Sequence, residues 1–234
     1  MRTSRRLYNW PMFLLIDKPK GMTSHDVVNR VRRVVGERKV GHGGTLDPNA
    51  TGLLIVGVGR AATKRLGEIA QKTKKSYEAE IILGEERDTD DVEGRIVKKN
   101  EKEKPSKNNV EAVLKELTGE IEQIPPTFSA IKMDGKKAYE LARKGKEVKM
   151  EVRKVTVYKS ELADYQYPVL RVVFEVSSGT YIRALARDIG RKLGCGAYLV
   201  NLRRTQIGKF KIVQAVSLEG LDKDNWKRYT VNEL

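Results

Sequence analysis

The sequence contains one cysteine, Cys195, and two histidines, His25 and His42. No disulfide can therefore form within the chain, and the cysteine-rich ligand sets of structural zinc sites are excluded. Two histidines also argue against a histidine-rich metal site. No apolar run is long enough to cross a bilayer, and the basic start of the chain is too short and broken for a signal peptide. We expect a soluble, cytoplasmic protein with no metal and no membrane partner.

Acidic residues are scarce relative to basic ones, 31 against 46, which gives a net charge of +15 and a pI near 9.8. Such an excess favours a polyanionic partner, because lysine and arginine gain free energy by displacing counterions from phosphates. Solubility, or the composition of heat-adapted proteins, is the alternative explanation. The basic residues are not gathered on one amphipathic helix, so an anionic membrane fits less well than a nucleic acid.

The 234 residues, 39% of them apolar, suffice for one large domain or two small ones. Neither repeats nor an internal linker are visible. Apolar periodicity and turn residues predict strands separated by helices of uneven length, which indicates a mixed α+β fold. The expected strands cover residues 12–16, 53–58, 76–83, 152–158, 169–176 and part of 197–209. The expected helices cover residues 24–35, 61–71, 109–117, 138–144 and 181–193.

Residues 41–52 contain four glycines around one carboxylate, Asp47. Glycine permits positive φ and close approach of a ligand, and Pro48 biases Asp47 towards an extended conformation. A carboxylate on such a loop suits a nucleophile or base that must touch a substrate. From the loop alone, a turn residue without a catalytic role is the competing interpretation.

Three further charged groups stand out. The predicted last helix carries Arg183, Arg187 and Arg191 as a basic stripe beside its apolar face. Asp88, Asp90 and Asp91 form an acidic cluster that we interpret as a solvated turn rather than a metal site. The segment 127–149 interleaves lysine and arginine with Phe128 and Tyr139, as a phosphate-binding and stacking surface does, although a solvated lysine face has the same composition.

Several motifs, taken in order, resemble those of the TruB-type tRNA pseudouridine synthases. The resemblance covers residues 12–218 and rests on the sequences DKPKGMTS (17–24), GHGGTLDP (41–48), KSY (75–77), QIPP (123–126), GTYIR (179–183) and LGCGA (193–197). It implies a mixed, mostly antiparallel sheet with flanking helices around a central cleft. It also implies isomerisation of the T-loop uridine of tRNA, position 55, to pseudouridine by base flipping, without cofactor or metal.

On this resemblance, residues 1–234 are expected to form one catalytic domain, with a thumb-like RNA-binding segment over 125–149. Residues 219–234 are expected to form a short tail, too short for the PUA-type RNA-binding domain that many members carry. The tail residues Trp226 and Tyr229 are expected to pack back onto the body.

The resemblance assigns catalytic roles to three residues. Asp47 matches the catalytic aspartate, which could attack the sugar or the base, or support an oxocarbenium-like or glycal intermediate. Arg183 matches an active-site arginine that would keep Asp47 ionised and oriented. Tyr77 matches a tyrosine that stacks on the target base, although its strand alternation is equally typical of a core tyrosine.

Other positions are expected to contact RNA or support the site. His42 resembles the histidine that contacts the T loop, although Gly43 stands where many members have threonine. Lys18 belongs to a structural turn, with a phosphate contact expected from Lys20, and Leu202 matches an apolar cleft position. Asp91 resembles an aspartate that positions the arginine. The thumb lysines expected to bind RNA are Lys132, Lys136 and Lys137.

The favoured hypothesis is therefore an enzyme that acts on the T-arm stem-loop of free tRNA, as a monomer without an obligatory protein partner. Two alternatives are open. The chain could be an RNA-binding or tRNA-folding module with an idle catalytic loop. It could also be a guide-RNA-dependent synthase of the related archaeal and eukaryotic branch, although the accessory RNA-binding domain of that branch is absent here.

Overall fold

The computed structural model describes residues 11–100, 104–129, 131–133, 135–142 and 148–232. The chain divides into two compact units, a division that the expectation of one domain over 1–234 did not anticipate. Unit 1 comprises residues 1–77 and 202–234, and unit 2 comprises residues 78–201. The boundaries fall inside two long strands, β4 (Lys75–Leu83) and β12 (Ala197–Ile207). The mixed α+β fold with a mostly antiparallel sheet is confirmed.

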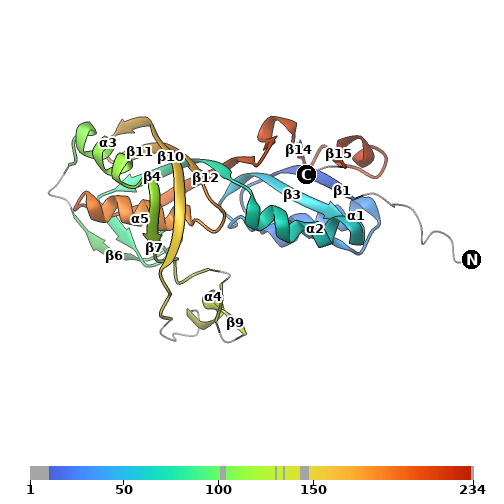
Figure 1. The fold of residues 1–234 in the computed structure, drawn as a ribbon, viewed down its shortest axis with the longest axis horizontal. Coiled ribbons are helices and arrows are strands. Elements are labelled where there is room, and N and C mark those ends of the chain that lie inside the picture. The colour runs from blue at the N-terminus through green and yellow to red at the C-terminus, as the bar shows by residue number, and fades with distance from the viewer. Residues whose placement is uncertain (1–10, 101–103, 130, 134, 143–147, 233–234) are drawn as a thin grey trace, which may run out of the picture. The chain divides into compact units, whose positions relative to one another are not determined.

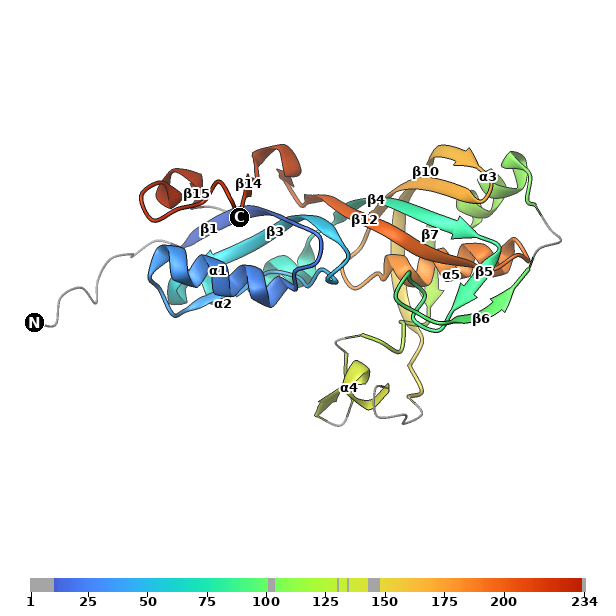
Figure 2. The same cartoon turned by 180° about the vertical axis from the view of Figure 1, so that it is seen from behind.

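Unit 1 is built on a sheet whose central pair is β1 and β3, antiparallel from Met12↔Val58 to Lys18↔Gly52. Two of its helices cover opposite faces of this pair (Figures 1 and 2). The elements are β1 (Met12–Lys18), α1 (Ser24–Val35), β2 (Val40–His42), β3 (Thr51–Val58), α2 (Gly59–Lys72), β13 (Phe210–Lys211), β14 (Val216–Ser217) and β15 (Thr230–Val231). Two 3₁₀ turns, η1 (Ile212–Gln214) and η2 (Trp226–Tyr229), complete it.

Alternation along β1 and β3 explains the two faces. Leu14 and Val56 pack against the valines of α1, whereas Phe13 and Ile55 pack against Leu66 and its neighbours in α2. Helix α1 begins at a capping box, because the Thr23 hydroxyl accepts from the Asp26 amide and the Asp26 carboxylate accepts from the Thr23 amide. Both helices lie close to their predicted bounds.

The tail of the chain belongs to the sheet of unit 1. β14 pairs with β1 in parallel and β15 pairs with it antiparallel. Trp226 is buried, as predicted, in the core between β1, β3 and α1. Tyr229, by contrast, is 42% exposed, so the expectation that it packs against the body holds only in part.

Unit 2 contains the strand order β12–β4–β11–β10–β7, with helices α3 and α5. Its remaining elements are β5 (Glu85–Arg87), β6 (Ile96–Lys99), α3 (Lys107–Glu116), β7 (Gly119–Gln123), β8 (Lys132–Met133), β9 (Lys136–Lys137), α4 (Ala138–Ala142), β10 (Arg153–Gln166), β11 (Val169–Val176) and α5 (Ile182–Lys192). β10 continues eight residues past its predicted end. The added residues are mostly polar, so the apolar pattern does not mark them as a strand, but β11 provides their hydrogen-bonding partners. β5 and β6 pair with each other in a separate two-stranded sheet.

Candidate active site

The Asp47 loop connects β2 to β3 in unit 1, and the Asp47 side chain is partly exposed. Its backbone is tied to the turn that follows β1. The Gly21 amide donates to the Pro48 carbonyl at 2.9 Å, and the Ala50 amide donates to the Asp47 carbonyl at 3.0 Å. Asp47 is thus presented on a loop whose shape is set by hydrogen bonds on both sides of Pro48.

Lys18 lies beneath this loop and is fully buried. Its ammonium donates to the carbonyls of Met22 (2.6 Å), Pro19 (2.9 Å) and Pro48 (3.2 Å). Burial lowers the pKa of Lys18 to about 8, although the nearby Asp47 carboxylate acts in the opposite direction. Lys18 therefore holds the loop from within the protein. Lys20, by contrast, is exposed.

Arg204 is a second buried cation at the loop, and sequence reasoning missed it. Its side chain is 1% exposed and donates to the carbonyls of Leu53 (2.8 Å) and Gly44 (3.1 Å). Lys75, 6% exposed, also lies close to Gly44, and its ammonium donates to the carbonyls of Ala70 and Thr73. Burial and the charge of Arg204 lower the pKa of Lys75 to about 8.

Three buried cations, Lys18, Lys75 and Arg204, thus lie at the loop, and each donates hydrogen bonds to backbone carbonyls. The Asp47 carboxylate in turn acts on Lys18, because its negative charge raises the pKa of the ammonium against the effect of burial.

His42 is partly buried at the end of β2, and burial lowers its pKa. Its Nδ1 atom is buried and has no hydrogen-bond partner within the described part of the chain. Buried polar atoms are normally satisfied, so an unpaired nitrogen needs an explanation. A contact with a substrate would supply one, as the sequence leads us to expect.

Tyr77 and Leu202 also belong to unit 1. Tyr77 is 7% exposed and shares the buried face of β4 with Ala79 and Ile81, so it packs as a core side chain does. Leu202 is partly buried in β12, and its carbonyl accepts a hydrogen bond from the Thr51 hydroxyl at 3.4 Å. The structure records no contact that assigns either residue a role towards a base.

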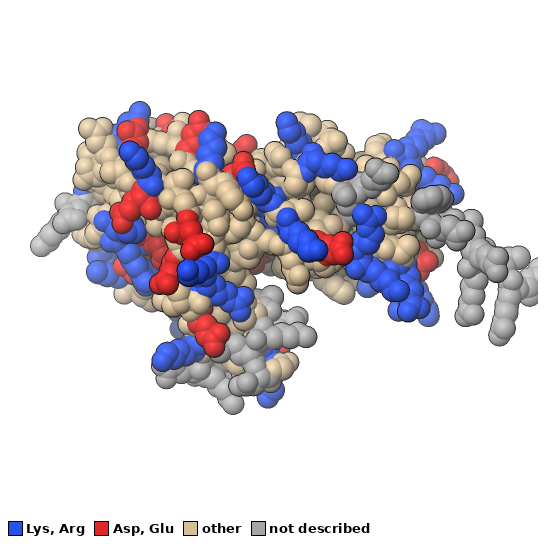
Figure 3. Space-filling view, in the orientation of Figure 1, with Lys and Arg blue, Asp and Glu red and all other residues tan. Residues whose placement is uncertain are grey.

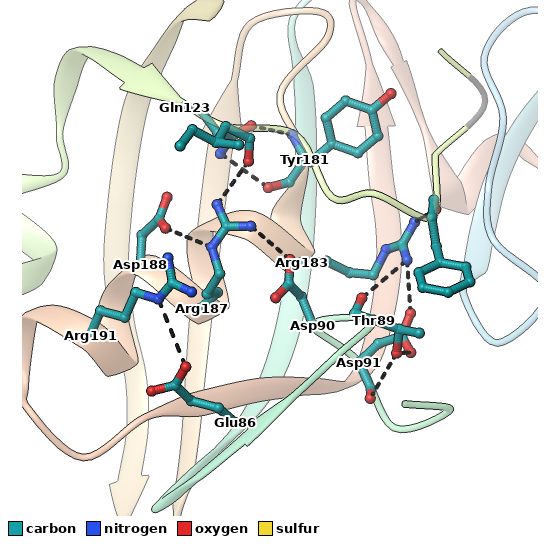
Figure 4. Close-up of polar contacts among 12 residues, drawn as sticks. Glu86, Thr89, Asp90, Asp91, Gln123, Tyr181, Arg183, Arg187, Asp188 and Arg191 are labelled. Carbon is teal, nitrogen blue, oxygen red and sulfur yellow. Dashed lines mark hydrogen bonds and ion pairs between the residues drawn. The ribbon is translucent and has the colours of Figure 1, made fainter. Parts of the chain in front are cut away.

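Arg183 lies in unit 2, at the first turn of α5, and is 7% exposed. Its Nη1 atom donates to the Asp91 carboxylate at 3.0 Å and to the Thr89 carbonyl at 3.3 Å, and its Nη2 atom donates to the Phe128 carbonyl at 3.0 Å (Figure 4). Asp91 is thus paired with Arg183, and the guanidinium is held in one orientation.

Arg187 repeats this arrangement one turn further along α5 (Figure 4). Its guanidinium donates to the Asp90 carboxylate at 2.8 Å, to the Ile124 carbonyl at 2.8 Å and to Asp188 at 3.0 Å. Burial raises the pKa of Asp90 to about 6, against the attraction of Arg187. Two arginines of α5 therefore hold two neighbouring aspartates and both ends of the segment 124–128, which leads into the expected thumb.

This geometry corrects one expectation. Of the acidic cluster interpreted as a solvated turn, only Asp88 is exposed, whereas Asp90 is 8% exposed and Asp90 and Asp91 are both paired with arginine. Within the basic stripe, Arg183 and Arg187 are buried and Arg191 is exposed, where its Nε lies 3.9 Å from Glu86. The sequence did contain a signal for the two aspartate–arginine ion pairs. Two aspartates are adjacent in the chain, and two arginines lie four residues apart on one face of the predicted helix.

Of the thumb lysines, Lys136 is exposed in the β8–β9 hairpin, where Lys132 pairs with Lys137 through the backbone. The side chains of Lys132 and Lys137 lie outside the described residues, as do residues 143–147 at the end of the helix expected over 138–144. The expected site residues are divided between the two units. Unit 1 contains Asp47, Tyr77, His42 and Leu202, and unit 2 contains Arg183 and Asp91. A contact between Asp47 and Arg183 therefore stays a prediction.

Across the described residues, no three His, Cys, Asp or Glu side chains are grouped as metal ligands would be. None of the helices in this part of the chain has the length and apolar character needed to span a membrane.

The sequence matches two family domains that together span most of its length. Residues 32–182 match the TruB family pseudouridylate synthase (N terminal domain), and residues 183–234 match the tRNA pseudouridylate synthase B C-terminal domain. The expected tail 219–234 falls within the second match.

Curated relatives give the same result. The chain is 45% identical to the tRNA pseudouridine synthase B of Arthrobacter sp. (strain FB24) over 217 residues, which cover 90% of this chain and 70% of the relative. It is 46% identical to the protein of that name from Mycobacterium tuberculosis (strain ATCC 25618 / H37Rv) over 215 residues, which cover 90% and 72% of the two chains.

Two solved structures with a similar fold are complexes that contain Cbf5 and Nop10. A chain of a Cbf5-Nop10-Gar1 complex has a TM-score of 0.69 and 31% identity, over 89% of this chain and 52% of that one. A chain of an archaeal box H/ACA sRNP Nop10-Cbf5 complex has a TM-score of 0.67 and 30% identity, over 92% and 55%. This chain therefore spans about half the length of those two.

Proposed function

The chain belongs to the TruB family of pseudouridylate synthases, and from this premise we propose that it isomerises the T-loop uridine of tRNA, position 55, to pseudouridine. In this reaction the N1–C1′ bond breaks, the base turns and a C5–C1′ bond forms. A proton leaves C5 and N1 gains one, so substrate and product contain the same atoms. The chemistry needs a positioned carboxylate and a flipped nucleotide, and it needs no redox partner.

The observation that carries this proposal is the position of Asp47, partly exposed on a loop held by Lys18 and Arg204. Because the loop is fixed from below by buried cations, its carboxylate can meet a substrate without losing its own orientation. We propose that Asp47 attacks the sugar or the base, or stabilises an oxocarbenium-like or glycal intermediate.

The remaining roles follow from the same family membership. We propose that Arg183, itself oriented by Asp91, pairs with the Asp47 carboxylate and orients it when RNA is bound. Tyr77 stacks on the flipped base and Leu202 lines the same apolar surface. The unpaired Nδ1 of His42 contacts the T loop and helps offset the lost base stacking, about a few kcal/mol.

The test is pseudouridine mapping at single-nucleotide resolution after incubation of the protein alone with an unmodified tRNA transcript. We expect product at position 55 with the parent protein and none with Asp47→Asn, while tRNA affinity changes little. Asp224→Asn is the matched control, because it makes the same carboxylate-to-amide change at an exposed position in unit 1. Turnover by a pure Asp47→Asn protein would refute the assignment.

The likeness to Cbf5 chains favours one second candidate, a synthase that needs a guide RNA and partner proteins. The same assay separates the two, because product formed by the protein alone excludes a required guide. If instead parent and Asp47→Asn refold tRNA equally well and neither forms pseudouridine, the chain is an RNA-folding module.

A further inference from the structure

The net charge of the protein lies almost entirely in one of its two units. Unit 1 contains 23 Lys and Arg against 9 Asp and Glu, a difference of +14, whereas unit 2 contains 23 against 22. The expected thumb belongs to the nearly neutral unit. An RNA bound at the Asp47 loop is therefore attracted more strongly to the surface of unit 1 than to the surface of unit 2.

Within unit 1, the charge gathers at the end of the β1–β3 sheet that lies away from Asp47. There the α1–β2 connection meets the start of α2, because the Gly59 amide donates to the Lys39 carbonyl at 2.7 Å and an Arg32 guanidinium nitrogen donates to the Val40 carbonyl at 3.0 Å. We call this surface the distal basic end. Its exposed members are Arg33, Arg38, Lys39, Arg60 and Lys64.

Acidic residues do not neutralise this surface. Glu37 lies within it, partly buried, and its carboxylate accepts a hydrogen bond from the Lys39 amide at 2.7 Å. Over the described residues, no ion pair joins any of the five cations to a carboxylate. Figure 3 shows Lys and Arg side chains gathered over this part of unit 1, with few acidic ones among them. In unit 2, by contrast, exposed lysines such as Lys154 and Lys192 pair with glutamates.

The distal basic end is too far from Asp47 to act on the target nucleotide itself. Strand β3 begins next to the Asp47 loop and ends at Val58, beside Lys39, so the two places are about 23 Å apart at about 3.3 Å per residue. The Debye length in physiological salt is about 8 Å. These cations can therefore contribute only through direct contact with phosphates at that distance.

We propose that the distal basic end binds the phosphate backbone of the RNA stem that continues from the target loop. This inference rests on the proposed function, because it takes the RNA at Asp47 as its starting point. An A-form RNA stem rises by about 2.8 Å per base pair, so it must extend roughly eight pairs from the loop to reach these cations. The surface thus selects for RNA with a long stem or a stacked continuation, and it recognises backbone rather than sequence.

The experiment compares two hairpins that carry the same loop, one with a stem of about four base pairs and one of about twelve, chosen to fall short of and beyond this reach. Affinity is measured as a function of salt for the parent and for the triple variant Arg38→Gln, Lys39→Gln, Arg60→Gln. All three side chains are exposed, so folding is not at stake. The matched control removes three exposed lysines of unit 2, Lys98→Gln, Lys107→Gln and Lys115→Gln.

With the long hairpin, we expect the triple variant to bind about ten- to a hundredfold more weakly at physiological salt, with a salt slope smaller by roughly two to three. With the short hairpin, it should bind as the parent does, and the unit 2 control should bind both hairpins nearly as the parent does. Equal losses on both hairpins, or equal losses in the control, would show a general charge effect and overturn the proposal.

Turnover keeps this test separate from that of the proposed function. The triple variant should convert the uridine of the short hairpin at the parental rate, because Asp47 and its supporting cations are unchanged. If the parent converts neither hairpin, the proposed function fails. If the parent converts both and the variant binds both normally, only the role of the distal basic end fails.

Discussion

Gly52, the second residue of β3, is the position at which a single methyl group should disturb the Asp47 loop most. Its φ is +102°, a conformation that side-chain-bearing residues rarely adopt. A Cβ atom there would lie 2.3 Å from the carbonyl oxygen and 2.7 Å from the amide nitrogen of Arg204. These are backbone atoms of β12, which pairs with β3 at this point, so no side-chain rotation can relieve the overlap.

The expected loss of stability for Gly52→Ala follows from these two terms. The backbone conformation costs about 1–2 kcal/mol for an L-residue. Separating β12 from β3 adds about 1–3 kcal/mol, as overpacking does. The Arg204 contacts with Leu53 and Gly44 would be strained as well, so we expect a total of about 3–5 kcal/mol and loss of pseudouridine formation.

Gly59→Ala is the matched control. Gly59 lies just beyond the other end of β3, its φ is +83°, and a Cβ atom there would meet nothing within 4 Å. It therefore carries the conformational cost without the overlap, about 1–2 kcal/mol, partly offset by reduced freedom of the unfolded chain. Activity should be retained in this variant.

Urea unfolding followed by tryptophan fluorescence measures the difference, because Trp226 is buried in the core of unit 1. If Gly52→Ala and Gly59→Ala lose the same stability, the close approach of β12 to β3 does not limit this position, and the argument from the Arg204 backbone is wrong.

Two further predictions concern buried charges. Lys75 has a pKa of about 8 in the folded protein and an ordinary pKa of 10.5, so the unfolded chain binds more protons than the folded one between these pH values. From pH 8 to 10.5, the unfolding free energy of the parent should therefore rise relative to that of Lys75→Met by up to about 3 kcal/mol. A difference that stays constant in urea unfolding across this range would contradict the buried ammonium. Arg187→Gln removes the cation from buried Asp90 and should lower the free energy of unfolding, measured by thermal unfolding, by about 3–5 kcal/mol. Arg191→Gln, at an exposed arginine, should change it by no more than about 0.5 kcal/mol. Similar losses in both variants would show that burial of the Arg187–Asp90 pair does not contribute to stability.

Most of the longer helices and strands, and the shape of the Asp47 loop, could be predicted from the sequence, because their signals are local. The valines of α1 recur at helical spacing, and its capping box needs only Thr23 and Asp26, three residues apart. The glycines and Pro48 shape the Asp47 loop through their own backbone preferences. The excess of lysine and arginine likewise indicated a polyanionic partner before any fold was known.

Only the tertiary structure decided which charged residues are buried and where the positive charge gathers. Arg183 and Arg187 read as a basic stripe until Asp91 and Asp90, more than ninety positions earlier, are brought beside them. Lys18 and Arg204 are buried where carbonyls of separate segments lie beside them, those of Pro48 for Lys18 and of Leu53 and Gly44 for Arg204. A polar side chain becomes a core residue only when folding supplies its partners, and no local pattern records partners that distant in the chain.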